Sequence, residues 1–119
     1  MTTFKRGDVV LVLFPDSNLR TAKKRPAIVV QADNLQTGLF QVIVALITSD
    51  LSRAGRPSRV TVLANSEAGT QTGLRLDSVI VTDNLATIQE KFIERVLGTF
   101  HNLKEIERSL AHTFGLNVR

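Results

Sequence analysis

The residues best placed to do chemistry stand at the ends of two apolar segments. Arg25 directly precedes Pro26, and a residue before proline is biased toward an extended conformation. Thr48 closes the next long apolar segment. If the two segments are neighbouring strands, Arg25 and Thr48 converge at one rim, where a guanidinium and a hydroxyl could hold a phosphodiester and stabilise the charge that develops on it. The competing interpretation is a solvated loop with Lys23 and Lys24, and a simple turn or helix cap after Thr48.

Most other kinds of catalytic chemistry have no visible site in the sequence. Cysteine is absent, which excludes thiolate catalysis, cysteine zinc sites and disulfide bonds. The sequence contains no HExxH motif, no glycine-rich phosphate loop and no GxGxxG motif, so we expect neither a metal nor a cofactor. The two histidines, His101 and His112, are expected to be structural or solvated.

Length and charge point to one domain with a polyanionic partner. A chain of 119 residues has room for a single domain, which we expect to span residues 1–119. The longest apolar runs have six residues, too few for a membrane span or a signal peptide, and the lack of cysteine fits the cytoplasm. The net charge is +4, and residues 1–60 carry nine basic against four acidic side chains. This basic half favours a partner such as nucleic acid.

The apolar patterning predicts a mainly β fold that ends in one α-helix. Several of the apolar segments lack alternation, which implies burial on both faces, as in a small closed or strongly curved barrel. Pro26 is expected to open its strand, because proline is disfavoured in the middle of a sheet. The expected strands are 8–14, 26–30, 40–47, 59–63, 78–82 and 95–100. The helix should pack on the barrel through a stripe of Leu103, Ile106, Leu110 and Phe114, and stop at Gly115.

Five short motifs follow one another in a characteristic order. They are KRGDVVLV from Lys5, KRPAIVV from Lys24, ITS from Ile47, LDSVIV from Leu76 and DNLATI from Asp83. Each motif alone is unspecific, but their order and spacing across nearly the whole chain resemble the MazF/PemK family of bacterial toxins. The resemblance implies an SH3-like small barrel of the PemK/MazF/CcdB type that forms a homodimer.

The resemblance also implies an activity. Such toxins belong to type II toxin–antitoxin systems and cleave single-stranded mRNA without a metal: the ribose 2′-OH attacks its own phosphate and leaves a 2′,3′-cyclic phosphate and a 5′-OH. The family's arginine before the proline falls on Arg25, and its strand-end threonine falls on Thr48. An arginine and an aspartate that a subset of the family carries before the fifth strand fall on Arg75 and Asp77, which could instead form a simple ion pair.

These positions lead to expected roles. Arg25 stays protonated and should clamp the phosphate, while Thr48 should orient a nonbridging oxygen or the 2′-OH. Some relatives carry a histidine between the first two strands, which this chain lacks, so proton abstraction is left to Asp77 or to positioning alone. Single-stranded RNA is usually held by stacking and by cationic side chains, and this chain offers only six Phe and no Tyr or Trp. The expected RNA-binding residues are Arg20, Lys23, Lys24, Ser49, Arg53, Arg56, Arg59 and Arg75.

The expected protein partner is a cognate antitoxin whose acidic, partly disordered tail folds onto the groove formed by these basic residues. Two other functions stay open at this point. One is a non-enzymatic gyrase poison like the CcdB toxins, which share the barrel, and the other is an RNA-binding relative without catalysis. A gyrase poison would act through its dimer surface and terminal helix and not through Arg25 and Thr48. The Arg25-Pro26 and Thr48-Ser49 elements favour the nuclease over both alternatives.

Overall fold

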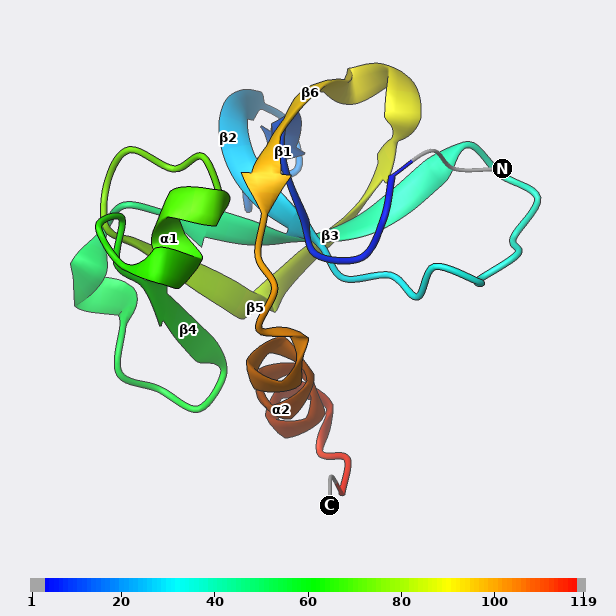
Figure 1. Ribbon diagram of the computed structural model, residues 1–119. Helices are drawn as coiled ribbons and strands as arrows, with labels where there is room; N and C mark the ends of the chain where they lie inside the picture. The colour runs from blue at the N-terminus through cyan, green and yellow to red at the C-terminus, as the bar shows by residue number, and fades with distance from the viewer. Residues whose placement is uncertain (1–3, 118–119) are drawn as a thin grey trace.

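The computed structural model describes residues 4–117, which form one strongly curved antiparallel sheet with helices around it (Figure 1). Across the sheet the strands are ordered β4-β5-β3-β2-β1-β6. The predicted mainly β fold with a terminal helix is confirmed. In chain order the elements are β1 (Asp8–Pro15), β2 (Ala22–Val29), β3 (Gln41–Thr48), η1 (Leu51–Arg53), β4 (Arg59–Val62), α1 (Glu67–Gln71), β5 (Ser78–Gln89), η2 (Glu90–Phe92), β6 (Ile93–Thr99) and α2 (Leu103–Phe114).

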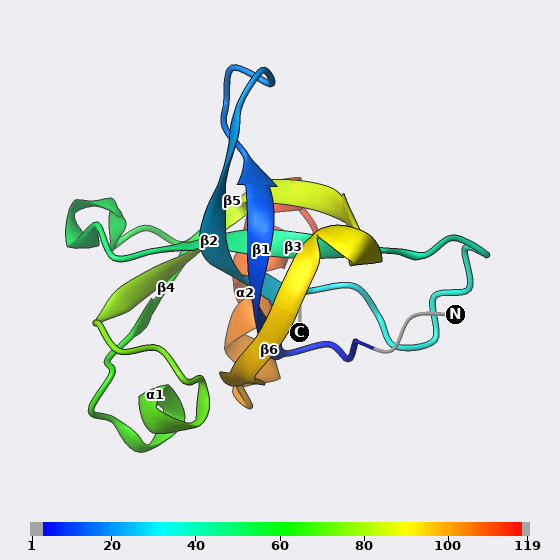
Figure 2. The same ribbon diagram turned by 90° about the horizontal axis from the view of Figure 1, so that it is seen from above.

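The sheet is buried on both faces, as the unbroken apolar segments predict. It curls so that β1 and β6 lie over β3 and β5 (Figures 1 and 2). One apolar cluster, which includes Val10 and Val44, lies between these layers, and a second, which includes Val9 and Ile80, lies on the other face toward α2. Because successive side chains of a strand point to opposite faces, the neighbours Val9 and Val10 can both be fully buried.

The helix α2 packs on the sheet through most of its predicted apolar stripe, since Ile106 is buried, Leu110 packs against the second cluster and Leu103 is half-buried, but its last member departs from the prediction. Its buried residues are Ile106, Ser109 and Ala111, whereas Phe114 is 60% exposed. The reason lies in β5, where the buried Thr82 Oγ1 shares hydrogen bonds with Ser109 Oγ at 2.6 Å and with Thr113 Oγ1 at 3.2 Å. A buried hydroxyl needs polar partners, so α2 turns its own hydroxyl side chains toward the sheet. The inclusion of Phe114 in the buried stripe was therefore wrong.

Two strands differ from their predicted bounds in ways that shape the site. Pro26 lies within β2, not at its start, because β2 pairs with β1 from Ala22 onward but with β3 only from Ala27. Pro26, which has no backbone N–H, therefore does not need to donate a ladder hydrogen bond to β3. The strand β5 continues past its predicted end at Thr82, through a β-bulge that contains Asp83 and Asn84. Turn-forming residues stand there inside a strand, where a bulge re-aims their side chains.

None of the helices formed by residues 4–117 is both long enough and apolar enough to cross a membrane.

Candidate active site

Arg25 and Thr48 come together at the rim of the sheet, as the sequence predicts. Two cavities of about 310 and 270 Å³ open there, and these two side chains are the ones that line both. The pair therefore forms a ridge between the cavities. We call the first the basic groove, lined by Lys24, Arg25, Pro26, Ile47, Thr48, Ser49, Leu74, Arg75, Leu76 and Ser78. We call the second the polar pocket, lined by Phe14, Pro15, Asp16, Ser17, Arg25, Leu46, Thr48, Arg53 and Asn84.

The register of two strands explains why the pair meets. Ala27 of β2 lies opposite Leu46 of β3, and the same antiparallel register carried two residues further sets Arg25 level with Thr48. Residues two apart in a strand share a face, so both side chains emerge on the same side of the sheet. Because pairing between the strands ends at Ala27, they separate beyond it and leave the rim open.

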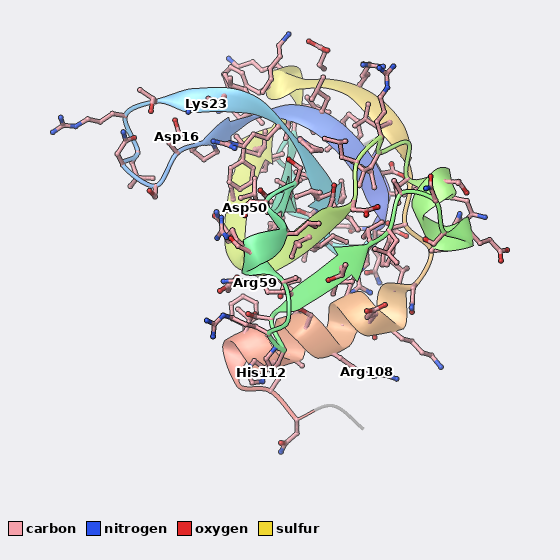
Figure 3. The ribbon with its side chains drawn as sticks, turned by 90° about the vertical axis from the view of Figure 1, so that its left-hand side faces the viewer. Asp16, Lys23, Asp50, Arg59, Arg108 and His112 are labelled. Atoms are coloured by element: carbon pink, nitrogen blue, oxygen red, sulfur yellow. The ribbon has the colours of Figure 1, made fainter. Side chains whose placement is uncertain are left out.

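A carboxylate that the sequence analysis missed holds the arginine in place. Arg25 Nη2 donates to Asp16 Oδ1 at 3.3 Å, and Thr21 Oγ1 donates to Asp16 Oδ2 at 2.6 Å. The Thr21 hydrogen bond, helped by Arg25 and Lys23, lowers the pKa of Asp16, so its carboxyl is ionised at neutral pH. Figure 3 shows Asp16 and Lys23 on the β1–β2 hairpin, on the same side of the molecule as Asp50. The one signal in the sequence was that Asp16 directly follows the first strand and Arg25 lies in the next.

Thr48 is held by the turn that follows it. The Asp50 N–H donates to Thr48 Oγ1 at 3.1 Å, and the Asp50 carboxylate caps η1 by accepting from Ser52 Oγ at 2.6 Å and Ser52 N at 3.1 Å. These Ser52 hydrogen bonds lower the pKa of Asp50. A turn and a helix cap do follow Thr48, as the competing interpretation of the sequence proposed. They leave the Thr48 hydroxyl at the rim, so they do not exclude a functional role for it. Since Thr48 Oγ1 accepts in this turn, its hydrogen is left to donate toward a bound anion.

The structure does not bring Asp77 to this pair. Its Oδ1 accepts a hydrogen bond from Ala64 N at 2.8 Å, and Asp77 is among the lining residues of neither the basic groove nor the polar pocket. Arg75 does line the basic groove, yet in the part of the chain that the structure describes it forms no ion pair with Asp77. The chain bends at Arg75 and Leu76 instead of running extended, so the alternation of an extended strand does not set the directions of the Arg75 and Asp77 side chains.

The other predicted RNA-binding residues are divided among several places. Lys24, Ser49 and Arg75 line the basic groove, although Lys24 Nζ also pairs with Glu94 Oε1 at 2.5 Å. Arg53 lines the polar pocket. Arg20, Lys23 and Arg56 are exposed side chains outside both cavities.

Arg59, another of the predicted RNA-binding residues, is tied into the fold by an ion pair. Its side chain is only 13% exposed and makes a two-point ion pair with Asp83, at 2.9 Å from Nε and 3.0 Å from Nη2. Its Nη1 donates to the Arg53 carbonyl at 2.7 Å. Arg59 therefore ties the β5 bulge to η1 and steadies the turn from which Arg53 reaches the polar pocket.

Replacing Asp83 by Asn is expected to lower the free energy of unfolding by about 1–2 kcal/mol at pH 7, because a charge-assisted pair to a largely buried guanidinium is lost while solvent screens the half-exposed carboxylate. The Arg59 hydrogen bonds lower the pKa of Asp83. The difference in the free energy of unfolding between the wild type and Asp83→Asn is therefore largest above the pKa of the Asp83 carboxyl in the unfolded chain. It disappears as the pH falls through the lowered pKa of the folded chain. Urea unfolding from pH 7 to about pH 3 measures it. A difference that stays constant over this range would contradict the assignment.

Metal ligands do not gather at this site. Within residues 4–117 no group of three or more His, Asp or Glu side chains is arranged to hold a metal ion.

Comparisons with known proteins add to this geometry. Residues 5–114 match the family described as PemK-like, MazF-like toxin of type II toxin-antitoxin system. The chain is 29% identical over 116 residues to Endoribonuclease MazF of Staphylococcus epidermidis, covering 95% of this chain and 92% of that protein.

Solved structures share the fold. One is an endoribonuclease in complex with its cognate antitoxin from mycobacterial species, with a TM-score of 0.75, 18% identity and coverage of 98% of this chain and 100% of that one. Another is MazF (Form-I) from Deinococcus radiodurans, with a TM-score of 0.70, 20% identity and coverage of 95% and 97%.

Proposed function

The chain belongs to the PemK-like, MazF-like toxins of type II toxin–antitoxin systems and is an endoribonuclease, and from this premise we propose that it cleaves single-stranded mRNA at a phosphate held between Arg25 and Thr48. The single observation that carries the proposal is the ridge itself. A permanently charged planar donor and a hydroxyl donor, from two different strands, border both cavities. A phosphodiester on the ridge would meet both side chains at once.

The reaction that fits these groups is internal transesterification. The ribose 2′ oxygen forms a bond to its own phosphorus, and the bond from phosphorus to the 5′ oxygen breaks, giving a 2′,3′-cyclic phosphate and a 5′-OH. Overall the 2′ oxygen loses one proton and the 5′ oxygen gains one. Negative charge builds on the phosphoryl oxygens in between, where fixed donors stabilise it most. Arg25 clamps this group through its guanidinium, and Thr48 donates to a nonbridging oxygen.

Positioning and charge stabilisation are the parts of catalysis that this site supplies. Asp16 is the acidic side chain among the described residues lining the two cavities, and its ion pair with Arg25 and lowered pKa suit it to orienting Arg25. Asp77 accepts a hydrogen bond from Ala64 N and is therefore poorly placed to take the 2′ proton. We therefore favour a cleavage reaction that uses neither Asp77 nor a metal ion, because the guanidinium of Arg25 supplies the positive charge beside the phosphate.

The partners follow from the surface and the family. We propose a cognate antitoxin with an acidic tail, because Lys23, Lys24 and Arg75 expose positive charge at or beside the basic groove. A homodimer is proposed on the family resemblance, and Phe92, Val96 and Phe114 are large exposed apolar side chains that a second copy could cover. The cytoplasm, where mRNA is translated, is the proposed compartment.

Sequencing the 5′-OH ends that the purified protein generates from a long mixed RNA tests the proposal. We expect cuts at a short recurring motif, with the same yield in excess EDTA. Intact RNA together with blocked gyrase supercoiling would overturn the nuclease in favour of a gyrase poison. Salt-dependent RNA binding without cuts would leave a binding protein only. Loss of cutting in EDTA would contradict a metal-independent reaction.

A further inference from the structure

The two cavities beside the Arg25–Thr48 ridge differ in chemistry. The basic groove has the cations of Lys24 and Arg75 and the apolar side chains of Leu74 and Leu76, and none of the described residues that line it is acidic. The polar pocket combines a carboxylate at Asp16, a guanidinium at Arg53 and an amide at Asn84. A strand of RNA that crosses the ridge therefore meets a different environment on each side of the phosphate.

The polar pocket suits the edge of a nucleobase better than a phosphate. The ionised Asp16 accepts hydrogen bonds and repels a phosphate, Arg53 only donates, and the Asn84 amide does both. This mixture of donors and acceptors matches the Watson–Crick and Hoogsteen edges by which single-stranded RNA is read.

The backbone that carries the groups that would read a base is held in place by the fold. Asn84 is half-buried and stands in the β5 bulge, where the pairing partner of β3 jumps from Leu85 to Val81. Arg53 belongs to η1, and the backbone carbonyl of Arg53 accepts a hydrogen bond from Arg59 Nη1 at 2.7 Å. The pocket is backed by Phe14 and Leu46, which are 1% and 5% exposed. Fixed donors and acceptors discriminate between bases, because a mismatch leaves them unpaired.

The basic groove suits the backbone and the faces of the bases instead. Arg75 and Lys24 supply charge for phosphates, and Leu76, which is 64% exposed, supplies apolar surface. Contacts of this kind raise affinity without distinguishing one base from another.

We propose that the polar pocket is the base-reading subsite for the nucleotide on one side of the scissile phosphate, with Asn84 and Arg53 as its specificity-determining residues, and that the basic groove holds the strand on the other side without reading its sequence. This inference rests on the proposed function, since it assigns subsites to the same cut.

The test compares the cuts that three proteins make in one mixed RNA: the wild type, Asn84→Ala and Arg75→Ala. In Asn84→Ala, the nucleotide preference at one position next to the cut is expected to fall about tenfold, which is at the lower end of what one good base contact contributes. The preferences at the other positions should stay unchanged. Arg75→Ala is expected to cut the same motif more slowly at all sites. The slope of log rate against log salt should become shallower by about 0.7, the value for one lost phosphate contact on a single strand.

Arg53→Ala is the second variant for the polar pocket, because it changes a turn side chain and leaves β5 untouched. It should relax the preference at the same position as Asn84→Ala, and it decides the matter if Asn84→Ala does not fold. An unchanged motif in the folded variants, or a motif altered by Arg75→Ala, would overturn the subsite assignment. RNA left whole by the wild type would instead overturn the proposed function, so the two failures are distinguishable.

Discussion

An RNA that carries a single 2′-deoxyribose at the scissile position is expected to stay uncut at that site. The proposed reaction uses the adjacent 2′-OH as its nucleophile, and its removal leaves only attack by water, which lacks the advantage of an internal group. Well-oriented internal nucleophiles have effective concentrations of about 10⁵ M or more, so the rate at the modified site should fall by several orders of magnitude. Gel analysis of an end-labelled oligonucleotide measures it.

The matched control for this substrate has its 2′-deoxyribose one nucleotide further along. That oligonucleotide should be cut at a rate near that of the unmodified RNA, because the reacting hydroxyl is still present. Cleavage of the first substrate at its modified site would show that another nucleophile attacks, and the transesterification would have to be given up.

Arg25→Ala is expected to slow cleavage by about 10²–10³-fold, the usual cost of removing one fixed donor to a developing oxyanion. The cleavage rate of Arg25→Lys should lie between those of the wild type and Arg25→Ala, because an ammonium group keeps the charge but not the planar geometry of the guanidinium. The fold should persist, since the Arg25 side chain is 36% exposed and its polar contact within the described residues is the ion pair with Asp16. Cleavage of a defined oligonucleotide measures the rate, and thermal unfolding checks the fold.

Asp77→Asn is the control for this variant. An Asn side chain keeps an oxygen that can accept from Ala64 N, so the turn should form and cleavage should remain near the wild-type rate. A folded Arg25→Ala protein with full activity would remove Arg25 from the site. A loss in Asp77→Asn as large as that in Arg25→Ala would place Asp77 in the chemistry after all.

The sequence by itself determined most of the fold and the centre of the proposed site. Strands are specified by local apolar runs, and the proline after Arg25 and the strand end at Thr48 are local signals too. The antiparallel register then brings Arg25 and Thr48 level, so their meeting followed from two strands being neighbours. These features depend on residues close together in the chain, and apolar pattern and backbone geometry are enough to predict them.

Only the tertiary structure decided which polar side chains pair with one another. Asp16 holds Arg25, Asp83 holds Arg59, and Asp77 faces Ala64 instead of the site. Each of these depends on a bend, a hairpin or a bulge whose direction is set by packing between distant segments. A carboxylate binds whichever donor that packing brings within hydrogen-bond distance, and nothing in its immediate sequence neighbourhood specifies that donor. The placement of the charged groups therefore had to come from the folded chain.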